Sequence, residues 1–257
     1  MSNVLLVKST GGRSKATPAV APGLMQLSLL NRFELARDGA PEVVPMSSQR
    51  LLALLAVHPW PLLRPYVAGT LWPDTSEERA HGSLRSALWR VQRLCPGLIE
   101  PAGAQLGIGP AVEVDLHTAE AFARHVVDDS DADVVGAHPP AHLLGDLLPD
   151  WYDDWLLFER ERFRDLRLRA LDVLCERLTC AGRFRDAAEV GHAALAAEPL
   201  RESAHRALVR IHLLEGNAVE ALRQYRLCRR LLDQQLGIEP SDLMKELMRD
   251  ATAPHAI

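Results

Sequence analysis

The chain has 257 residues, a formal net charge of −5 and an apolar fraction of 47%. That length suggests two domains of roughly 100–200 residues each, and the apolar fraction excludes a generally disordered protein. No apolar run reaches the ~20 residues that a membrane-spanning helix needs, and the N-terminal segment lacks the apolar core of a signal peptide. We therefore expect a cytoplasmic protein that does not contact a membrane.

The first part of the chain is predicted to begin with an arm and two strands. Residues 1–23 are rich in Ser, Gly, Ala and Pro without periodicity, which predicts a disordered arm. The apolar residues of Met25 to Leu35 partly alternate, as in a strand. Asp38-Gly39 marks a turn, after which Glu42 to Met46 is predicted to be a short second strand.

Three helices are predicted next. Ser47-Ser48 indicates the start of the first, and Pro65 to Trp72 forms a second, short helix. The third helix, Glu77 to Leu94, has the clearest start in the chain. Thr75 or Ser76 can cap its N-terminus, and the acids that follow favour the positive end of a helix.

Short strands separated by Gly and Pro come after the third helix. Leu98 to Glu100, Gln105 to Ile108 and Val112 to Val114 are predicted to form a small β-hairpin. Strands, three helices and a hairpin, in that order, are the plan of a winged helix-turn-helix, in which the hairpin is the wing. We therefore predict a winged-helix DNA-binding domain over residues 24–114.

The rest of the chain, residues 115–257, is predicted to be all-helical. His117 to Val127 is helical, Asp128 to Pro140 is an acidic linker, and helices fill the remainder. Gly182 and Gly216 recur at an offset of 34 residues, with small residues at matching places after each, which is the period of tetratricopeptide (TPR) helical hairpins. A chance spacing of glycines in an ordinary helical bundle is the alternative.

Charge divides the chain at the same place. Residues 1–114 carry 11 basic and 8 acidic side chains, a balance of +3, whereas residues 115–257 carry 18 and 26, a balance of −8. A basic front and an acidic back suggest different partners for the two parts. The alternative is an uneven surface charge without a function.

The third predicted helix carries the candidate DNA-reading surface. At 100° per residue, its apolar residues fall on one face: Ala80, Leu84, Ala87, Leu88, Val91 and Leu94. The rest of its surface has cations, a hydroxyl and an aromatic ring, and arginine and serine can bind phosphates or base edges. The alternatives are an ordinary solvated helix face and, for Trp89, packing on the wing. The candidate DNA-binding residues are Arg79, His81, Gly82, Arg85, Ser86, Trp89, Arg90 and Arg93.

Two stretches of the sequence resemble a known family. TLWPDTSEERAHGSLRSALWRVQRL (Thr70 to Leu94) resembles the helix-turn-helix of the Streptomyces antibiotic regulatory protein (SARP) family. EPLRESAHRALVRIHLLEGNAVEALRQYRLCRRLLDQQLGIEPS (Glu198 to Ser241) is similar to that family's bacterial transcriptional activator domain, and the resemblance covers about residues 24–250. It implies a mainly α fold, in which an N-terminal winged helix-turn-helix (α+β) precedes an all-α, TPR-like bacterial transcriptional activator domain.

The resemblance also implies a function and partners. The family binds direct repeats near promoters, recruits RNA polymerase and activates biosynthetic gene clusters such as those for antibiotics. By this resemblance, the helix from Glu77 to Leu94 enters the major groove, and the wing between Gln105 and Val112 touches the minor groove. We expect as partners double-stranded promoter DNA, RNA polymerase and, on DNA, a second copy forming a homodimer, all at the nucleoid. The loop implied to face polymerase consists of Trp72, Pro73, Asp74, Thr75 and Ser76.

Two other classes of protein are alternatives. An enzyme is disfavoured because the sequence has no G-x-S-x-G, no H-E-x-x-H and no glycine-rich phosphate loop, so we predict no catalytic residue, metal or cofactor. The acids Asp153, Asp154, Glu159 and Glu161 are interpreted as a solvated helix start. The four cysteines show no metal-ligand spacing and are predicted to be buried free thiols. The second alternative is a TPR-like interaction scaffold or ligand sensor with a non-functional winged helix.

Overall fold

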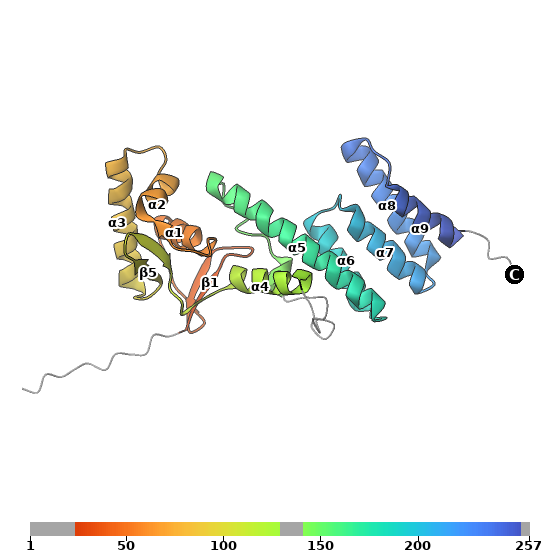
Figure 1. Cartoon of the computed structure of the whole chain (residues 1–257), viewed down its shortest axis with the longest axis horizontal. Helices are drawn as coiled ribbons and strands as arrows, with labels where there is room; N and C mark the ends of the chain where they lie inside the picture. Colours follow the sequence, from red (N-terminus) through yellow and green to blue (C-terminus); the bar gives the residue numbers. More distant parts are fainter. Residues whose placement is uncertain (1–23, 129–140, 253–257) are drawn as a thin grey trace, which may run out of the picture.

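The computed structural model describes residues 24–128 and 141–252. The predicted arm over residues 1–23 and the predicted linker, apart from Asp128, lie outside the described residues. Figure 1 shows a front part with short strands and three helices, followed by a row of helices that leads away from it. The described chain is thus mainly helical, with its strands confined to the front part.

A four-stranded sheet opens the front part, in the order β3-β2-β1-β7. β1 pairs antiparallel with β2, so that Leu27 lies opposite Leu35, and parallel with β7, so that Leu27 also lies opposite Val114. The predicted turn at Asp38-Gly39 is confirmed, since both residues have positive φ angles. The strands are β1 (Met25–Ser28), β2 (Glu34–Arg37), β3 (Ala40–Pro41) and β7 (Val112–Val114).

Two strand predictions in this region are wrong. Met25 to Leu35 is not one strand, because the backbone N–H groups of Leu29 and Leu30 donate to the carboxylate of Asp115 at 2.8 and 3.1 Å instead of continuing the ladder. Asn31 then has a φ of 69° and turns the chain back into β2. The strand expected at Glu42 to Met46 is displaced to β3, directly after the turn.

The three predicted helices follow and pack on one another. The third has the predicted bounds, and Ser76 occupies its N-cap position. Ser76 makes no capping hydrogen bond, however, and the hydroxyl of Thr75 donates to the carbonyl of Trp72 at 3.1 Å, so the predicted side-chain cap is wrong. The helices are α1 (Met46–Ala56), α2 (Arg64–Leu71) and α3 (Glu77–Leu94), with the two-residue strand β4 (Leu62–Leu63) before α2.

The predicted wing is a hairpin of β5 (Ile99–Ala102) and β6 (Gln105–Ile108), joined at Gly103 with a φ of 62°. β4 pairs with the other edge of β6. The third segment assigned to the hairpin, Val112 to Val114, instead forms β7 of the first sheet. The turn of the hairpin therefore lies between β5 and β6 at Gly103, and the segment between Gln105 and Val112, expected to be the wing that touches the minor groove, consists of β6 and the chain that leads to β7.

Helices make up the rest of the described chain. Gly182 and Gly216 follow α5 and α7 with φ angles of 72° and 77°, conformations that favour glycine, and each turns the chain into the second helix of a hairpin. No helix within the described ranges is long and apolar enough to span a membrane. The elements are α4 (Asp115–Asp128), the 3₁₀ helix η2 (Ala141–Leu144), α5 (Asp154–Cys180), α6 (Phe184–Ala197), α7 (Glu202–Leu214), α8 (Ala218–Leu236) and α9 (Asp242–Thr252).

One hydrophobic core runs through both parts of the chain, from β1 in the front to α7 in the helical part. A second, smaller core joins α7, α8 and α9. Polar contacts also cross between the parts: the guanidinium of Arg50 lies 2.5 Å from the carboxylate of Asp153, and Nε2 of His117 lies 2.6 Å from the carbonyl oxygen of Ala56. The division at residues 114 and 115 stays a prediction, and the two parts pack as neighbours across it.

Candidate nucleic-acid interface

Packing fixes which face of α3 points outward. Ala80, Leu84, Ala87 and Val91 are buried against the front part, as the apolar stripe predicted. Leu88 and Leu94 lie at its edges and are half-buried. A helix held along one stripe presents its opposite face as a rigid surface, and this surface can position side chains for recognition.

The outward face of α3 is cationic. Of the candidate DNA-binding residues, His81 and Gly82 are half-buried, and Nε2 of His81 lies 3.7 Å from the carboxylate of Glu77. No acidic residue follows Glu78 until Glu100, beyond the end of the helix. The exposed candidates are Arg79, Arg85, Ser86, Trp89, Arg90 and Arg93.

The arginines of this face are not bound into ion pairs with any residue that the structure describes. Arg79 and Arg85 make no side-chain hydrogen bond either, Arg90 donates to the hydroxyl of Ser47 at 3.3 Å, and the guanidinium of Arg93 lies 5.3 Å from the centre of the Trp89 ring. In the helical part, by contrast, most arginines pair with a carboxylate. The α3 cations are therefore available to an anion from outside.

A shallow groove gathers most of the candidates. Arg79, Gly82, Arg85, Ser86 and Arg90 line it together with Trp72 and Thr75 from the loop before α3. Two further lining residues, Ser47 and Ser83, were not predicted. Ser47 was interpreted only as a helix start, but the positive N-terminal end of α1 brings its hydroxyl beside the α3 cations, where an anion is favoured.

Trp89 lies outside this groove, on the side of the wing. It lines a second hollow with Arg64, Arg85, Ile99 and Pro101, and 61% of its surface is exposed. The aromatic ring therefore borders the wing and still presents most of its surface to solvent. Arg64, at the start of α2, adds a cation here that no sequence pattern distinguished.

Gly82 has no packing reason to be a glycine. A Cβ atom built on it would meet nothing closer than the end of the Arg85 side chain, at 3.7 Å. The hydroxyl of Ser86 donates to the Gly82 carbonyl at 3.0 Å and keeps its own lone pairs free to accept a hydrogen bond. Gly82 therefore adds no side chain to this turn of α3, beside which the Arg85 guanidinium lies.

The loop between α2 and α3 has one anchored residue and an exposed turn. The ring of Trp72 packs against the core, and the Thr75 hydroxyl is tied to the Trp72 carbonyl. Pro73, Asp74, Thr75 and Ser76 are exposed. The turn therefore has a fixed shape and an accessible surface.

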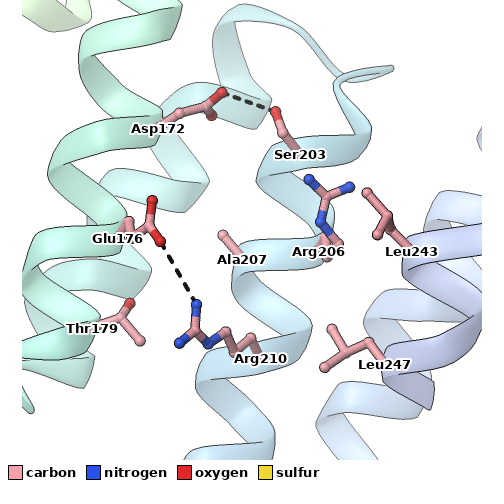
Figure 2. A pocket seen from close by; sticks show the side chains of 9 residues that line it. All are labelled: Asp172, Glu176, Thr179, Ser203, Arg206, Ala207, Arg210, Leu243 and Leu247. Carbon is pink, nitrogen blue, oxygen red and sulfur yellow. Dashed lines mark hydrogen bonds and ion pairs between the residues drawn. The ribbon is translucent and has the colours of Figure 1, made fainter. Parts of the chain in front are cut away.

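Another hollow, of about 520 Å³, lies in the helical part, between α5, α7 and α9. Figure 2 shows Asp172 and Glu176 on one wall, Arg206 and Arg210 opposite, and Leu243 and Leu247 on α9 at the side. Asp172 is committed to Arg201 at 2.7 Å and to Ser203 at 3.0 Å, whereas Arg210 lies 4.0 Å from Glu176. The hollow thus offers both signs of charge and exposed aliphatic surface.

Most of the acidic residues near Trp151 have structural partners. Asp153 pairs with Arg50, Glu159 with Arg162 and Glu161 with Arg164, so three of the four acids near Trp151 are ion-paired side chains, and Asp154 is exposed at the start of α5. Within the described ranges, no group of three or more His, Cys, Asp and Glu could hold a metal ion.

The prediction of buried thiols is right for three of the four cysteines. Cys95, Cys175 and Cys228 are buried and free, but Cys180 is exposed, because it lies in the last turn of α5 and points away from the core. Burial raises the pKa of Cys175 and that of Cys228 to about 11, so neither thiol is appreciably ionised at neutral pH.

Comparisons with known proteins agree with this architecture. Residues 141–250 match the family model of the bacterial transcriptional activator domain. Among solved structures, the chain is similar to Mycobacterium tuberculosis EmbR in complex with a low-affinity phosphopeptide, with a TM-score of 0.69 and 20% sequence identity over 89% of this chain and 65% of that chain. The chain thus spans slightly less than two thirds of the EmbR chain, and at this identity the likeness is one of fold. No curated protein sequence matches.

These findings define the class of protein. Residues 141–250 form a bacterial transcriptional activator domain, and a small α+β part precedes them in an EmbR-like fold. The bacterial transcriptional activator domain that the resemblance implied and the mainly α fold class are thereby confirmed.

Proposed function

We propose that this chain is a transcriptional regulator that binds specific DNA sequences through α3. The observation that carries the proposal is the outward face of α3. Its arginines form no ion pair with any described residue, and no acidic residue occurs in the helix after Glu78. Phosphate binding by arginine supplies most of the affinity of proteins for DNA, and contacts to base edges supply the specificity.

The dimensions of α3 suit the major groove. Eighteen residues span about 27 Å, and a major groove of about 12 Å admits one helix. Arg85 and Arg90 are the candidates for bidentate contacts to guanine, while Arg79 lies where a phosphate can be bound. Because Gly82 has no side chain, the DNA backbone can approach α3 closely at this turn.

The wing is expected to contribute less than α3. No lysine or arginine occurs between Ile99 and Val114, so the hairpin turn offers phosphates or the minor groove only uncharged groups, namely the backbone at Gly103 and Ala104 and the side-chain amide of Gln105. We propose that Arg64, beside the hairpin, supplies the charge that the wing lacks.

The finer function follows the SARP resemblance. We propose that the protein activates a biosynthetic gene cluster by recruiting RNA polymerase, and that the exposed turn of Pro73, Asp74, Thr75 and Ser76 faces the polymerase, with Trp72 anchoring it. Two copies on direct repeats would form a homodimer on promoter DNA at the nucleoid of the cytoplasm. A fixed and exposed turn next to a DNA-reading helix supports this role.

Genome-wide DNA capture with the purified protein tests the proposal. The wild type should enrich a few promoters that share a repeated motif, and the variant with Arg85, Arg90 and Arg93 changed to Ala should lose them. The matched control changes Arg185, an exposed arginine of α6 far along the chain from α3, and should capture the same promoters. Unchanged capture by the triple variant would show that α3 is not the reading helix.

A second candidate function is that of a ligand sensor or TPR-like scaffold, which the hollow between α5, α7 and α9 favours (Figure 2). Its paired charges and aliphatic wall suit a ligand with both polar and apolar groups. Absence of any DNA enrichment by well-folded protein, together with a stable complex that Arg210→Ala weakens, would favour this function over the first.

A further inference from the structure

The outer face of α5 carries acids around an exposed aromatic ring. Asp154, Phe158, Glu161 and Asp165 follow one another at intervals of 4, 3 and 4 residues, which places them on one side of a helix. Phe158 is 83% exposed, and Tyr152 just before the helix is 90% exposed. We call the four helical residues the acidic strip.

The outer face of α8 carries a strip of the opposite charge with the same spacing. Val219, Arg223, Arg226 and Arg230 are exposed and also follow at intervals of 4, 3 and 4 residues. The opposite side of α8, with Ala221, is buried. We call these four exposed residues the basic strip, in which Val219 is 65% exposed.

The charges of both strips are free to bind a partner. Asp154 and Asp165 on one strip, and Arg226 and Arg230 on the other, form no ion pair or side-chain hydrogen bond with any residue that the structure describes. The remaining charges pair only within their own helices, as Glu161 does with Arg164 and Arg223 with Glu220. Exposed pairs of this kind are weak and easily exchanged.

The two strips of one molecule cannot meet each other. Figure 1 places α8 at the end of the helical part farthest from the front, whereas the N-terminal end of α5 lies by the front part. The contact between Arg50 of α1 and Asp153 fixes this end of α5 in place. Any pairing of the strips therefore requires two molecules.

We infer that the acidic strip of one copy docks on the basic strip of a second copy. Each strip spans 11 helical steps, or about 17 Å, so the two are equal in length. Whether the two helices run parallel or antiparallel, the common spacing places two carboxylates of the acidic strip opposite arginines of the basic strip. It also places Phe158 against an arginine, where a cation–π contact can form.

The contact joins unlike surfaces and so relates the two copies head to tail. A head-to-tail contact repeats the same orientation from copy to copy, which is the arrangement that direct repeats on DNA demand and that a two-fold dimer does not provide. This consequence rests on the proposed DNA binding, whereas the contact itself can be measured without DNA.

Sedimentation of the full chain at low salt tests the contact through an exchange of charges. The wild type should self-associate as its concentration rises towards about 1 mM, which is the effective concentration that neighbouring sites on one DNA molecule impose. Asp154→Arg with Asp165→Arg, and separately Arg226→Asp with Arg230→Asp, should each weaken association at least about tenfold. A chain that carries all four changes should recover it.

The matched control is Arg32→Asp with Arg185→Asp, which alters the net charge as the basic-strip variant does but lies on neither strip. It should associate like the wild type. The inference is overturned if the wild type stays monomeric over the whole concentration range. It is also overturned if the folded chain with all four substitutions fails to recover association. Loss of DNA binding in any variant bears on the proposed function alone.

Discussion

The four arginines on the outer face of α3 set how steeply DNA binding should fall with salt. If Arg79, Arg85, Arg90 and Arg93 each neutralise the charge of one phosphate, whether the guanidinium binds that phosphate or a neighbouring base edge, the logarithm of the binding constant should fall against the logarithm of salt concentration with a slope of about −3.6 for each bound copy. Raising salt fourfold, from about 50 to about 200 mM, should then weaken binding roughly 150-fold.

Single substitutions separate charge from base recognition. Arg85→Ala should make the slope shallower by about 0.9, because one phosphate contact or its equivalent is lost. Arg85→Lys keeps the charge and should keep the slope, but it should cost about 1–3 kcal/mol of discrimination if Arg85 binds a guanine bidentately. Fluorescence anisotropy with a labelled fragment carrying one copy of the captured motif measures both quantities.

The control for this series is Arg185→Ala on α6, which should leave the slope unchanged. A wild-type slope near zero, or an Arg85→Ala slope equal to that of the wild type, would falsify the reasoning that α3 cations bind phosphates. A steep slope that only Arg226→Ala changes would instead move the DNA contact to α8.

Three further predictions concern the stability and chemistry of the fold. Cys180 should be the first thiol that a maleimide modifies at pH 7, as read by intact mass, because it is exposed while burial holds the pKa of Cys175 at about 11; labelling that persists in Cys180→Ser would contradict this. Burial lowers the pKa of His205, so the unfolded chain takes up its proton first as pH falls below the ordinary value of 6.5. Urea titrations should therefore show wild-type stability declining from pH 7 to pH 5 by more than that of His205→Gln, and equal declines would count against it. Arg50→Ala should cost about 1–3 kcal/mol of unfolding free energy, since it leaves the largely buried carboxylate of Asp153 unpaired, and an unchanged urea midpoint would show that the pair contributes nothing.

Local signals in the sequence were sufficient for the helices. The start of α3 follows from the run of acids and hydroxyls around Ser76, and its end follows from Pro96 and Gly97. The glycines at residues 182 and 216 fixed the helical hairpins because each has the positive φ that ends one helix and begins the next. The spacing of the apolar residues in α3 then predicts which face of the helix is buried and which face, with its cations, points outward.

Contacts between distant residues explain what the sequence left out. The predicted strand from Met25 to Leu35 breaks because the backbone N–H group of Leu29 donates a hydrogen bond to the carboxylate of Asp115, 86 residues away. β7 was assigned to the wing since it follows the hairpin closely, but its parallel pairing with β1 is a long-range contact that no local pattern encodes. Ser47 reaches the α3 groove for the same reason, because α1 packs across α3.

The core that runs from β1 through α4 and α5 to α7 also limits how this protein can be rebuilt. A chimera that joins a foreign winged helix to this activator domain at residue 115 would leave the buried faces of α4 and α5 against a surface that does not fit them. It would also strip Asp153 of Arg50 and His117 of the Ala56 carbonyl. Under the proposed function, DNA specificity is therefore better redirected by changing the outer face of α3 alone, because those residues are the ones that the shared core does not hold.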